Sequence, residues 1–220
     1  MLFLWQKNKS GPIGRLSAIF KVKMILFFDT ETTGLCPGNV IQLAYIMTDG
    51  QTVKGKNFFF YVPFIERAAS MVHGITVEKL ATLSNGHTFS EYLEEIDDDF
   101  RAASLTVAHN FPFDFNFMSH EFEQHNRRFH FKESLDTMRY FCPITKLEKA
   151  RGKGYKYPKL CELAKFFDLY DYDVMRFALN LFKGSGVSHD ARFDIAQTYL
   201  CTMLASEQYP EVNELLKKYY

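Results

Sequence analysis

The run Met24–Asp29 (MILFFD) is apolar from end to end except for its final carboxylate. A strand with one face in water alternates apolar and polar residues, so a run of this kind predicts a strand buried on both faces. Such a strand needs helices on both sides of its sheet. The chain is therefore constrained toward a layered α/β fold, with Asp29 where the strand leaves the core.

The segments that follow alternate between strand-like and helix-like patterns. Val40–Met47 and Asn57–Val62 are predicted strands, separated by a turn signal at Asp49-Gly50, and Ser104–Ala108 is a predicted short central strand. Helical patterns are predicted over residues 89–100, 110–126, 136–141, 158–167 and 188–205. This order indicates a mixed sheet flanked by helices.

The length of 220 residues suits one domain. We expect a folded domain over residues 24–208 and a short helix or tail over 209–220. Residues 1–23 are predicted to be a dispensable extension or the product of an upstream start. No apolar run approaches the ~18 residues of a membrane-spanning helix. Four widely spaced cysteines predict reduced thiols and a cytoplasmic protein: Cys36, Cys142, Cys161 and Cys201.

The formal net charge of zero hides an uneven distribution. Residues 1–23 hold five basic and no acidic residues, which leaves a net charge of −5 on the rest. Such a body cannot bind nucleic acid through a broadly positive surface, so it would need metal ions or a local basic patch. Residues 146–159 are such a patch, a predicted mobile loop with six basic residues and one acid. It is either solvated surface or a phosphate-binding segment that acts through Lys153 and Lys156.

The helix predicted over 89–100 carries a cluster of acids: Glu91, Glu94, Glu95, Asp97, Asp98 and Asp99. Its apolar residues recur at helical spacing, so the acids fall between them. We interpret them as a solvated helix face and not as a metal site.

The segment Asp29-Thr30-Glu31-Thr32-Thr33-Gly34 carries the strongest chemical signal. Residues two apart on a strand point to the same face, so Asp29 and Glu31 place two carboxylates side by side at the strand end. Oxygen ligands of this kind suit Mg²⁺ and Mn²⁺.

Two later segments add acids and a histidine. Asp114 falls in the first turn of the helix that Asn110 is predicted to cap and Pro112 to open. His189 and Asp194 are five residues apart, about 140° around a helix, so they converge only if His189 precedes the helix start. Histidine can then act as a base while Asp194 holds metal.

Together, DTETTG, AHNFPFDFNFM and SHDARFD resemble the motifs of the DEDDh exonucleases, a group that includes the epsilon proofreading subunits of bacterial DNA polymerase III and ribonuclease T. The resemblance implies a ribonuclease H-like fold and a metal-dependent 3′→5′ exonuclease. It covers most of residues 24–205, and the long stretch from Asp168 to Gly186 departs from it. A single strand of DNA or RNA would be the substrate, and its 3′ end would be attacked.

The resemblance also implies roles for individual residues. Asp29, Glu31, Asp114 and Asp194 would hold two ions of Mg²⁺ or Mn²⁺, and His189 would be the general base. The weaker candidates for binding substrate are Thr30, Thr33, His73 and Asn110. The chain has Asp190 where the tyrosine branch of these nucleases needs tyrosine, so the histidine branch is the better match. Asp190 could compete as a ligand, but we interpret it as an acid at the helix start.

Three other interpretations compete with this one. The first is a zinc-protease site at His120 and His125. These histidines are five residues apart, whereas zinc proteases need histidines four apart on one helix face, so the spacing argues against such a site. A proofreading subunit bound to a polymerase is one alternative, and a short segment after the last motif favours a nuclease that works alone. A catalytically silent nucleic-acid-binding module is another, against which the full set of acids and His189 argues. A polymerase or a second copy of the chain is a candidate partner.

Overall fold

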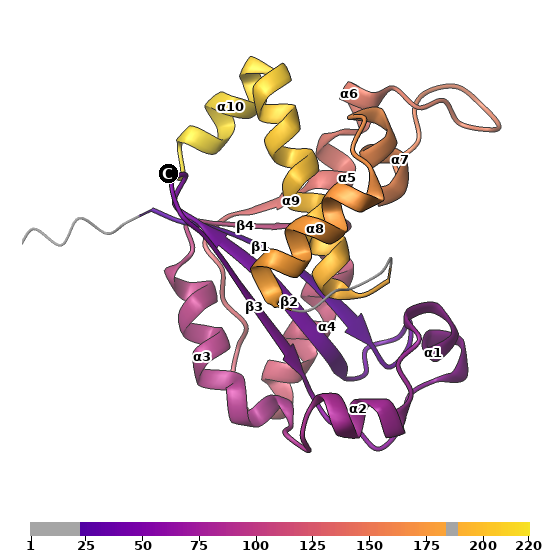
Figure 1. Ribbon diagram of the computed structural model, residues 1–220, viewed down its shortest axis with the longest axis vertical. Coiled ribbons are helices and arrows are strands. Elements are labelled where there is room, and N and C mark those ends of the chain that lie inside the picture. Colours follow the sequence, from indigo (N-terminus) through magenta and orange to yellow (C-terminus); the bar gives the residue numbers. More distant parts are fainter. Residues whose placement is uncertain (1–22, 184–188) are drawn as a thin grey trace, which may run out of the picture.

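A five-stranded mixed sheet forms the centre of the molecule in the computed structural model, which describes residues 23–183 and 189–220 (Figure 1). The strand order is β3-β2-β1-β4-β5. β1 pairs antiparallel with β2 and β2 with β3, whereas β4 lies parallel to both β1 and β5. The strands are β1 (Ile25–Thr32), β2 (Val40–Thr48), β3 (Val53–Phe59), β4 (Leu105–Ala108) and β5 (Ser134–Asp136).

Helices cover both faces of this sheet, as the doubly buried first strand predicts (Figure 1). The first half of the chain contributes α1 (Arg67–His73), α2 (Val77–Leu83), α3 (Phe89–Ala102) and α4 (Phe111–Gln124). The second half contributes α5 (Thr137–Tyr140), α6 (Cys142–Thr145), α7 (Leu160–Phe166), α8 (Asp171–Phe182), α9 (Ala191–Gln208) and α10 (Pro210–Lys217).

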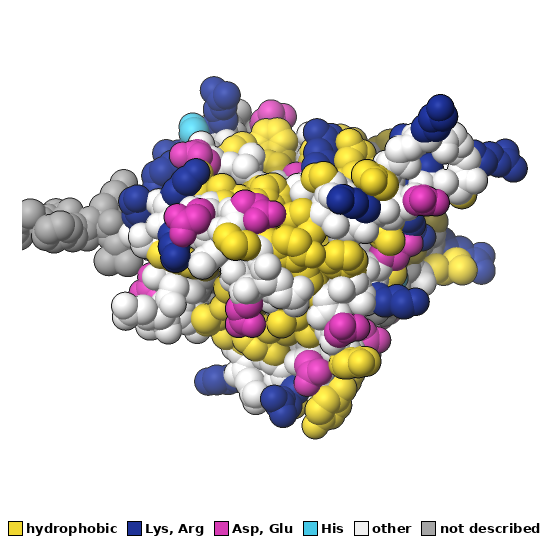
Figure 2. All heavy atoms as spheres, turned by 90° about the horizontal axis from the view of Figure 1, so that it is seen from above, with side chains coloured by type: hydrophobic (Ala, Val, Ile, Leu, Met, Phe, Trp, Pro, Cys, Tyr) yellow, Lys and Arg dark blue, Asp and Glu magenta, His cyan; other side chains and the backbone are white. Residues whose placement is uncertain are grey.

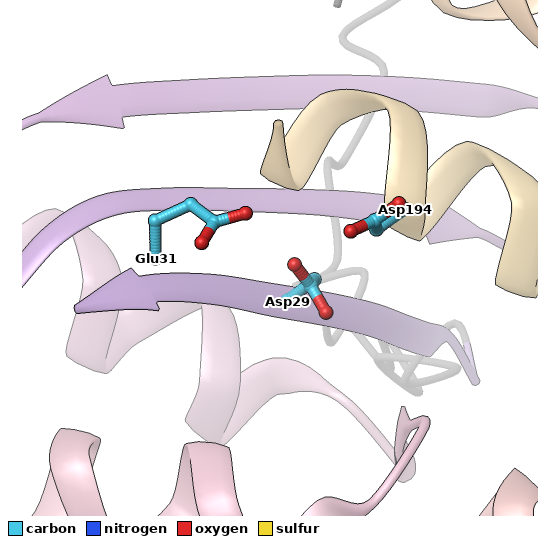
Figure 3. Close-up of side chains that lie close together, drawn as sticks. All are labelled: Asp29, Glu31 and Asp194. Atoms are coloured by element: carbon cyan, nitrogen blue, oxygen red, sulfur yellow. The ribbon is translucent and has the colours of Figure 1, made fainter. Parts of the chain in front are cut away.

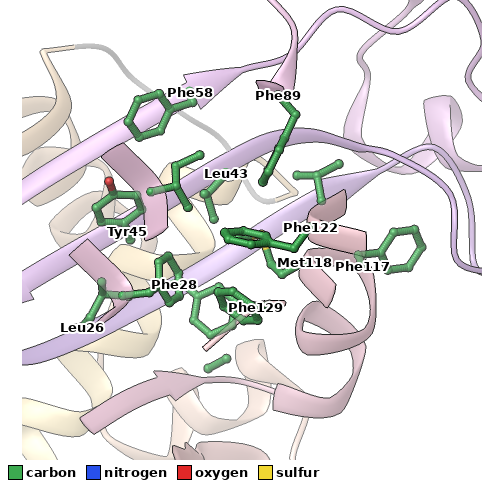
Figure 4. Close-up of a cluster of buried hydrophobic side chains, with 14 of the residues drawn as sticks. Leu26, Phe28, Leu43, Tyr45, Phe58, Phe89, Phe117, Met118, Phe122 and Phe129 are labelled. Carbon is green, nitrogen blue, oxygen red and sulfur yellow. The ribbon is translucent and has the colours of Figure 1, made fainter. Parts of the chain in front are cut away.

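Alternate residues of β1 supply two separate cores. Leu26 and Phe28 pack with aromatic side chains of α3 and α4, and the ring of Phe28 lies 5.1 Å from that of Phe100 (Figure 4). Ile25 and Phe27 point to the other face and pack against α7, α9 and α10. Every one of these four residues of β1 is fully buried, which confirms the fold class expected from the run.

Several elements differ from the sequence-based expectation. β3 begins at Val53 and not at Asn57, because the Asp49 side chain accepts hydrogen bonds from the Gln51 and Thr52 amides and closes the turn at once. β5 was not anticipated, since its three residues gain their strand conformation from pairing with β4. The long stretch from Asp168 contains α8, whose Leu181 and Phe182 lie over Gly55 of β3.

The basic segment 146–159 forms an arm that projects from the body beside α6 and α7 (Figure 1). No helix in the described part of the chain is long and apolar enough to cross a membrane. The extension over residues 1–22 and the glycine-containing break at 184–186 lie outside the described residues.

Candidate active site

Asp29 and Glu31 lie near the end of β1 with the alternation that the sequence predicts. Their partners on β2 are Ala44 and Gln42. Both side chains lie on the face that α9 covers, and the carboxylates point toward one another and toward α9 (Figure 3). The strand thus carries apolar residues into the core and ends in two acids on the same face.

Asp194 in the first turn of α9 completes the cluster (Figure 3). One carboxylate oxygen from each of Asp29, Glu31 and Asp194 lies within 4.8 Å of the other two. Among residues 23–183 and 189–220, this is the one group of three or more potential ligands at such a spacing. Glu31 and Asp194, which are 163 positions apart in the chain, meet here. The motifs predict this meeting, whereas the composition of the chain does not.

Asp114 reaches the same strand from the first turn of α4 and is only 3% exposed. Its Oδ1 accepts hydrogen bonds from the Thr30 amide (3.0 Å) and the Thr30 hydroxyl (2.7 Å). Its negative charge also raises the pKa of Asp29, after the larger effect of burial. Asp114 therefore lies beside the three clustered acids without sharing their tight grouping.

Burial and mutual repulsion hold these acids toward their protonated forms. Burial first, and then the charges of Asp194, Asp190 and Asp114, raise the pKa of Glu31 to about 9. Burial also raises the pKa of Asp114 to about 7 and that of Asp194 to about 6. Such shifts arise where like charges gather in a low-dielectric place without a countercharge.

His189 lies before the start of α9, the position that its spacing from Asp194 requires. Its backbone has a left-handed conformation, with φ of 66°, and its side chain is exposed. The His189 backbone N–H donates to the Asp194 carboxylate, and the charge of His189 lowers the pKa of Asp194 against the effect of burial. The histidine is thus placed at the edge of the carboxylate cluster.

Asp190 occupies the N-cap of α9, in agreement with its interpretation as an acid of the helix start. Its carboxylate accepts hydrogen bonds from the Arg192 amide (3.0 Å) and guanidinium (2.6 Å). Because Arg192 compensates its charge, Asp190 is poorly suited to act as a fifth metal ligand.

The weaker candidates for substrate binding are distributed differently. The Thr30 amide and hydroxyl bind Asp114, and the Thr33 hydroxyl accepts from the Asn39 amide at 3.0 Å. Asn110 takes the N-cap position of α4, but its side chain makes no capping hydrogen bond, so the expected cap is wrong in its chemistry. A left-handed backbone, with φ of 72°, holds Asn110 at the exposed helix start instead.

His73 at the end of α1 lines a hollow of about 210 Å³ that opens beside Glu31. Leu35, Val72 and Phe113 give this hollow an apolar rim. Burial lowers the pKa of His73, and the Thr32 backbone partly offsets that effect. A largely neutral histidine thus lies next to the acids, in a hollow with both polar and apolar walls.

Gln42 is a positioning residue that the motifs did not reveal. It is fully buried on β2, opposite Glu31. Its Nε2 donates to Asp190 at 3.0 Å, and its Oε1 accepts from the Ala191 amide at 3.3 Å. These bonds fix the start of α9, and hence Asp194, to β2. The signal was present, since Gln42 is the one amide in the otherwise apolar run VIQLAYIM.

Residues 26–171 match a family model described as exonuclease. The chain belongs to this exonuclease family. The match includes Asp29, Glu31 and Asp114 but ends before His189 and Asp194. The assignment of those two residues to the exonuclease site therefore depends on their geometry beside the matched acids.

The chain is also similar in sequence to named DNA polymerase III proteins. The chain is 35% identical over 106 residues to DNA polymerase III subunit epsilon of Rickettsia conorii, covering 44% of this chain and 43% of that protein. It is 32% identical over 152 residues to a PolC-type DNA polymerase III of Mycoplasmopsis pulmonis, covering 67% of this chain and 10% of that protein. The chain thus spans less than half the length of these relatives.

The fold also resembles that of solved structures. Exonuclease I of E. coli, solved with a dA16 oligonucleotide, superposes with a TM-score of 0.69 at 18% identity. The similarity covers 89% of this chain and 43% of the other. It confirms the ribonuclease H-like arrangement of a mixed sheet between helices.

Proposed function

We propose that the chain is a metal-dependent 3′→5′ exonuclease that hydrolyses the terminal phosphodiester bond of DNA or RNA and releases nucleoside 5′-monophosphates. The observation that carries this proposal is the meeting of Asp29, Glu31 and Asp194, with His189 at their edge. Membership of the exonuclease family supports it independently.

The chemistry of the clustered acids fits divalent cations. Three carboxylate oxygens within 4.8 Å of one another offer the hard donors that Mg²⁺ and Mn²⁺ prefer. Burial, and after it the repulsion of neighbouring carboxylates, raises the pKa values of Asp29 and Glu31, and a bound cation would offset both effects. The proposed occupants are two such ions, held by Asp29, Glu31 and Asp194 with Asp114 as the fourth acid. When bound, they supply positive charge for the phosphate and make an attacking water more acidic.

The remaining side chains have roles that follow from their positions. His189 would accept the proton of the attacking water, and its exposure would let that proton pass to solvent. The bond from its backbone N–H to Asp194 fixes it beside the metal-holding acids. The hollow lined by His73 and Phe113 would receive the terminal nucleotide, with the apolar rim against the base and Glu31 at its inner wall.

A second candidate role is proofreading as part of a replicative polymerase. It is favoured by the names of the relatives, several of which are DNA polymerase III subunits epsilon. In that case the catalytic steps are unchanged and a polymerase is the partner. A second copy of the chain, forming a homodimer, is the other candidate partner.

All four cysteines are free thiols in the structure, and the cytoplasmic location stays a prediction.

The experiment compares single-stranded DNA and RNA with free or blocked 3′ ends, in Mg²⁺, Mn²⁺ or chelator. We expect release of 5′-monophosphates from free 3′ ends only, and none in chelator. Replacement of the base, His189→Gln, should slow turnover by ~10²–10⁴-fold and leave metal binding intact. Activity in chelator, or cleavage of 3′-blocked strands at the normal rate, would refute the proposal.

A further inference from the structure

The arm over residues 146–159 is the most positively charged segment that the candidate site does not use. It gathers six basic residues, Lys146, Lys149, Arg151, Lys153, Lys156 and Lys159, against the single acid Glu148. Figure 2 shows dark blue side chains at the far edge of the molecule on the side where the arm projects in Figure 1. The rest of residues 24–220 carries more acidic than basic residues, so the arm has the opposite net charge to the body.

The arm has internal structure that gives it a defined shape. Glu148 and Tyr155 form an antiparallel bridge, and the Lys156 amide donates to the Leu147 carbonyl at 2.8 Å. At its tip, Gly152 and Gly154 adopt left-handed backbones, with φ of 84° and 94°, that side chains rarely tolerate. The arm is thus a narrow hairpin that presents its side chains outward.

The basic residues of the arm divide into two groups. Lys156 near the base forms an ion pair with Glu162 of α7. This corrects the expectation that Lys156 is available to a phosphate. Lys149, Arg151 and Lys153 at the tip are exposed, and within the described chain no carboxylate forms an ion pair with them. Three positive charges at the tip are therefore uncompensated.

The base of the arm is fixed to the segment that carries the candidate site. The Pro158 carbonyl lies 3.1 Å from the Nε2 of His109, and the Nδ1 of His109 lies 3.0 Å from the Thr137 hydroxyl. His109 directly follows β4 and begins the turn into α4, and Asp114 lies in the first turn of α4. A short chain of contacts thus connects the arm to the acids.

Two tyrosines on the arm add an aromatic surface. Tyr155 is 46% exposed and Tyr157 is 56% exposed. Aromatic rings interleaved with basic side chains are the combination that binds single strands, since rings stack on bases and cations hold the phosphates.

We propose that this arm binds the single strand upstream of its 3′ end, with Lys149, Arg151 and Lys153 against backbone phosphates and the two tyrosines against bases. The inference rests on the proposed function, because it needs a strand whose 3′ end lies among the acids. The arm supplies the positive charge that the net negative body lacks. It acts on binding and not on hydrolysis, since its side chains do not belong to the carboxylate cluster.

The test removes the three charges together in the variant Lys149→Ala/Arg151→Ala/Lys153→Ala. A matched control, Lys54→Ala/Arg176→Ala/Lys218→Ala, removes three exposed charges elsewhere. Binding of a 5′-labelled oligonucleotide of about 20 nucleotides with a free 3′ end is measured against salt in the presence of Mg²⁺, with Asp29→Asn added to prevent hydrolysis. Each phosphate contact on a single strand contributes about −0.7 to the slope of log affinity against log salt, so the arm variant should flatten the slope by about 2.

Kinetics separate binding from chemistry. With the wild-type site, the arm variant should raise KM for the long strand, leave kcat unchanged, and hydrolyse a dinucleotide at the normal rate. A salt slope equal to that of the control variant would overturn the role of the arm, even in an active enzyme. The opposite result is also informative. If the wild type hydrolyses no strand but the arm variant still flattens the salt slope of binding, the proposed function is overturned and the arm remains a binding surface.

Discussion

Two acidic clusters in this chain have opposite surroundings. The acids on α3 are compensated by cations: Arg127 contacts Glu94 and Asp97, and Lys56 contacts Glu95 and Asp99. In the candidate active site, no lysine or arginine of the described residues forms an ion pair with Asp29, Glu31, Asp114 or Asp194. Lysines and arginines of the described chain thus pair with four of the six acids on α3 but with none of the four acids in the candidate site.

The difference distinguishes the candidate metal site from an ordinary acidic surface. α3 carries more acids than the end of β1, yet most of its charges are paired with basic side chains, and the unpaired Asp98 is exposed to solvent. The acids on β1 and α9 are packed together without that compensation, and their pKa values rise. A carboxylate cluster that a protein buries and leaves unpaired is strained until a cation neutralises it. Absence of countercharge, more than the number of acids, therefore distinguishes the candidate metal site from α3.

The largest effect should follow from Asp29→Asn. A metal ion contributes several kcal/mol of transition-state stabilisation, and each 1.36 kcal/mol changes the rate tenfold, so we expect a loss of at least ~10³-fold in turnover. The initial rate on a labelled single strand in Mg²⁺ measures this. Asp97→Asn on α3 is the control and should keep wild-type turnover per folded molecule. Near-normal turnover of the Asp29 variant would remove the distinction between the clusters.

The second effect concerns stability against pH in chelator. Because burial raises the pKa of Glu31 to about 9, the folded protein keeps a proton that the unfolded chain releases above about 4.5. The metal-free protein should therefore lose stability as pH rises from about 4.5 toward 9, by on the order of several kcal/mol. Thermal unfolding at a series of pH values measures the trend.

Glu31→Gln supplies the control for this trend. The variant should flatten the pH dependence and stabilise the metal-free protein near neutral pH, while it weakens metal binding. Buried Glu121, whose pKa burial raises to about 7, contributes in the same direction but contacts the Val40 amide and not the site. Added Mg²⁺ should therefore restore the part due to the site acids, Asp29, Glu31, Asp114 and Asp194, and leave the part due to Glu121. An unchanged pH dependence in Glu31→Gln would show that the site acids are not strained.

Much of this contrast could be predicted from the sequence. The apolar run before Asp29 predicted a doubly buried strand, and the alternation of Asp29 and Glu31 predicted their shared face. The spacing of His189 and Asp194 required His189 to precede a helix, as the structure confirms. These features depend on local periodicity, which a sequence displays directly.

The parts that were missed depend on contacts between distant segments. Asp97 was expected to be solvated, but it is 1% exposed because Arg101 and Arg127 enclose it. Arg127 lies after α4, and nothing in the local pattern of α3 points to it. The tether from Gln42 to α9 and the brief strand β5 likewise depend on partners far along the chain.

The third effect is the loss of stability in Asp97→Asn. This buried carboxylate receives hydrogen bonds from Arg101 at 2.8 Å and from Arg127. Replacing it leaves Arg101 without its carboxylate partner and Arg127 with Glu94 alone, which should cost about 1–3 kcal/mol of unfolding free energy. Urea denaturation measures this, and activity at low urea should stay normal. A variant as stable as the wild type would mean that the paired cluster contributes nothing to the fold.

The smallest effect separates exposure from pairing within the α3 cluster. Glu94 shares Arg127 with Asp97, but its side chain is 78% exposed, so solvent and salt screen its charge. Glu94→Gln should therefore cost no more than about 0.2–1 kcal/mol, and the loss should shrink further as salt is raised. The same urea denaturation, run at low and high salt, compares Glu94→Gln, Asp97→Asn and the double variant. Because both acids contact one guanidinium, the double variant should differ from the sum of the single losses. Suppose that Glu94→Gln lowered the unfolding free energy as much as Asp97→Asn does. Burial would then not determine how much a paired carboxylate stabilises this protein. The contrast between α3 and the unpaired acids around Asp29 would then depend on the presence of countercharge and not on burial.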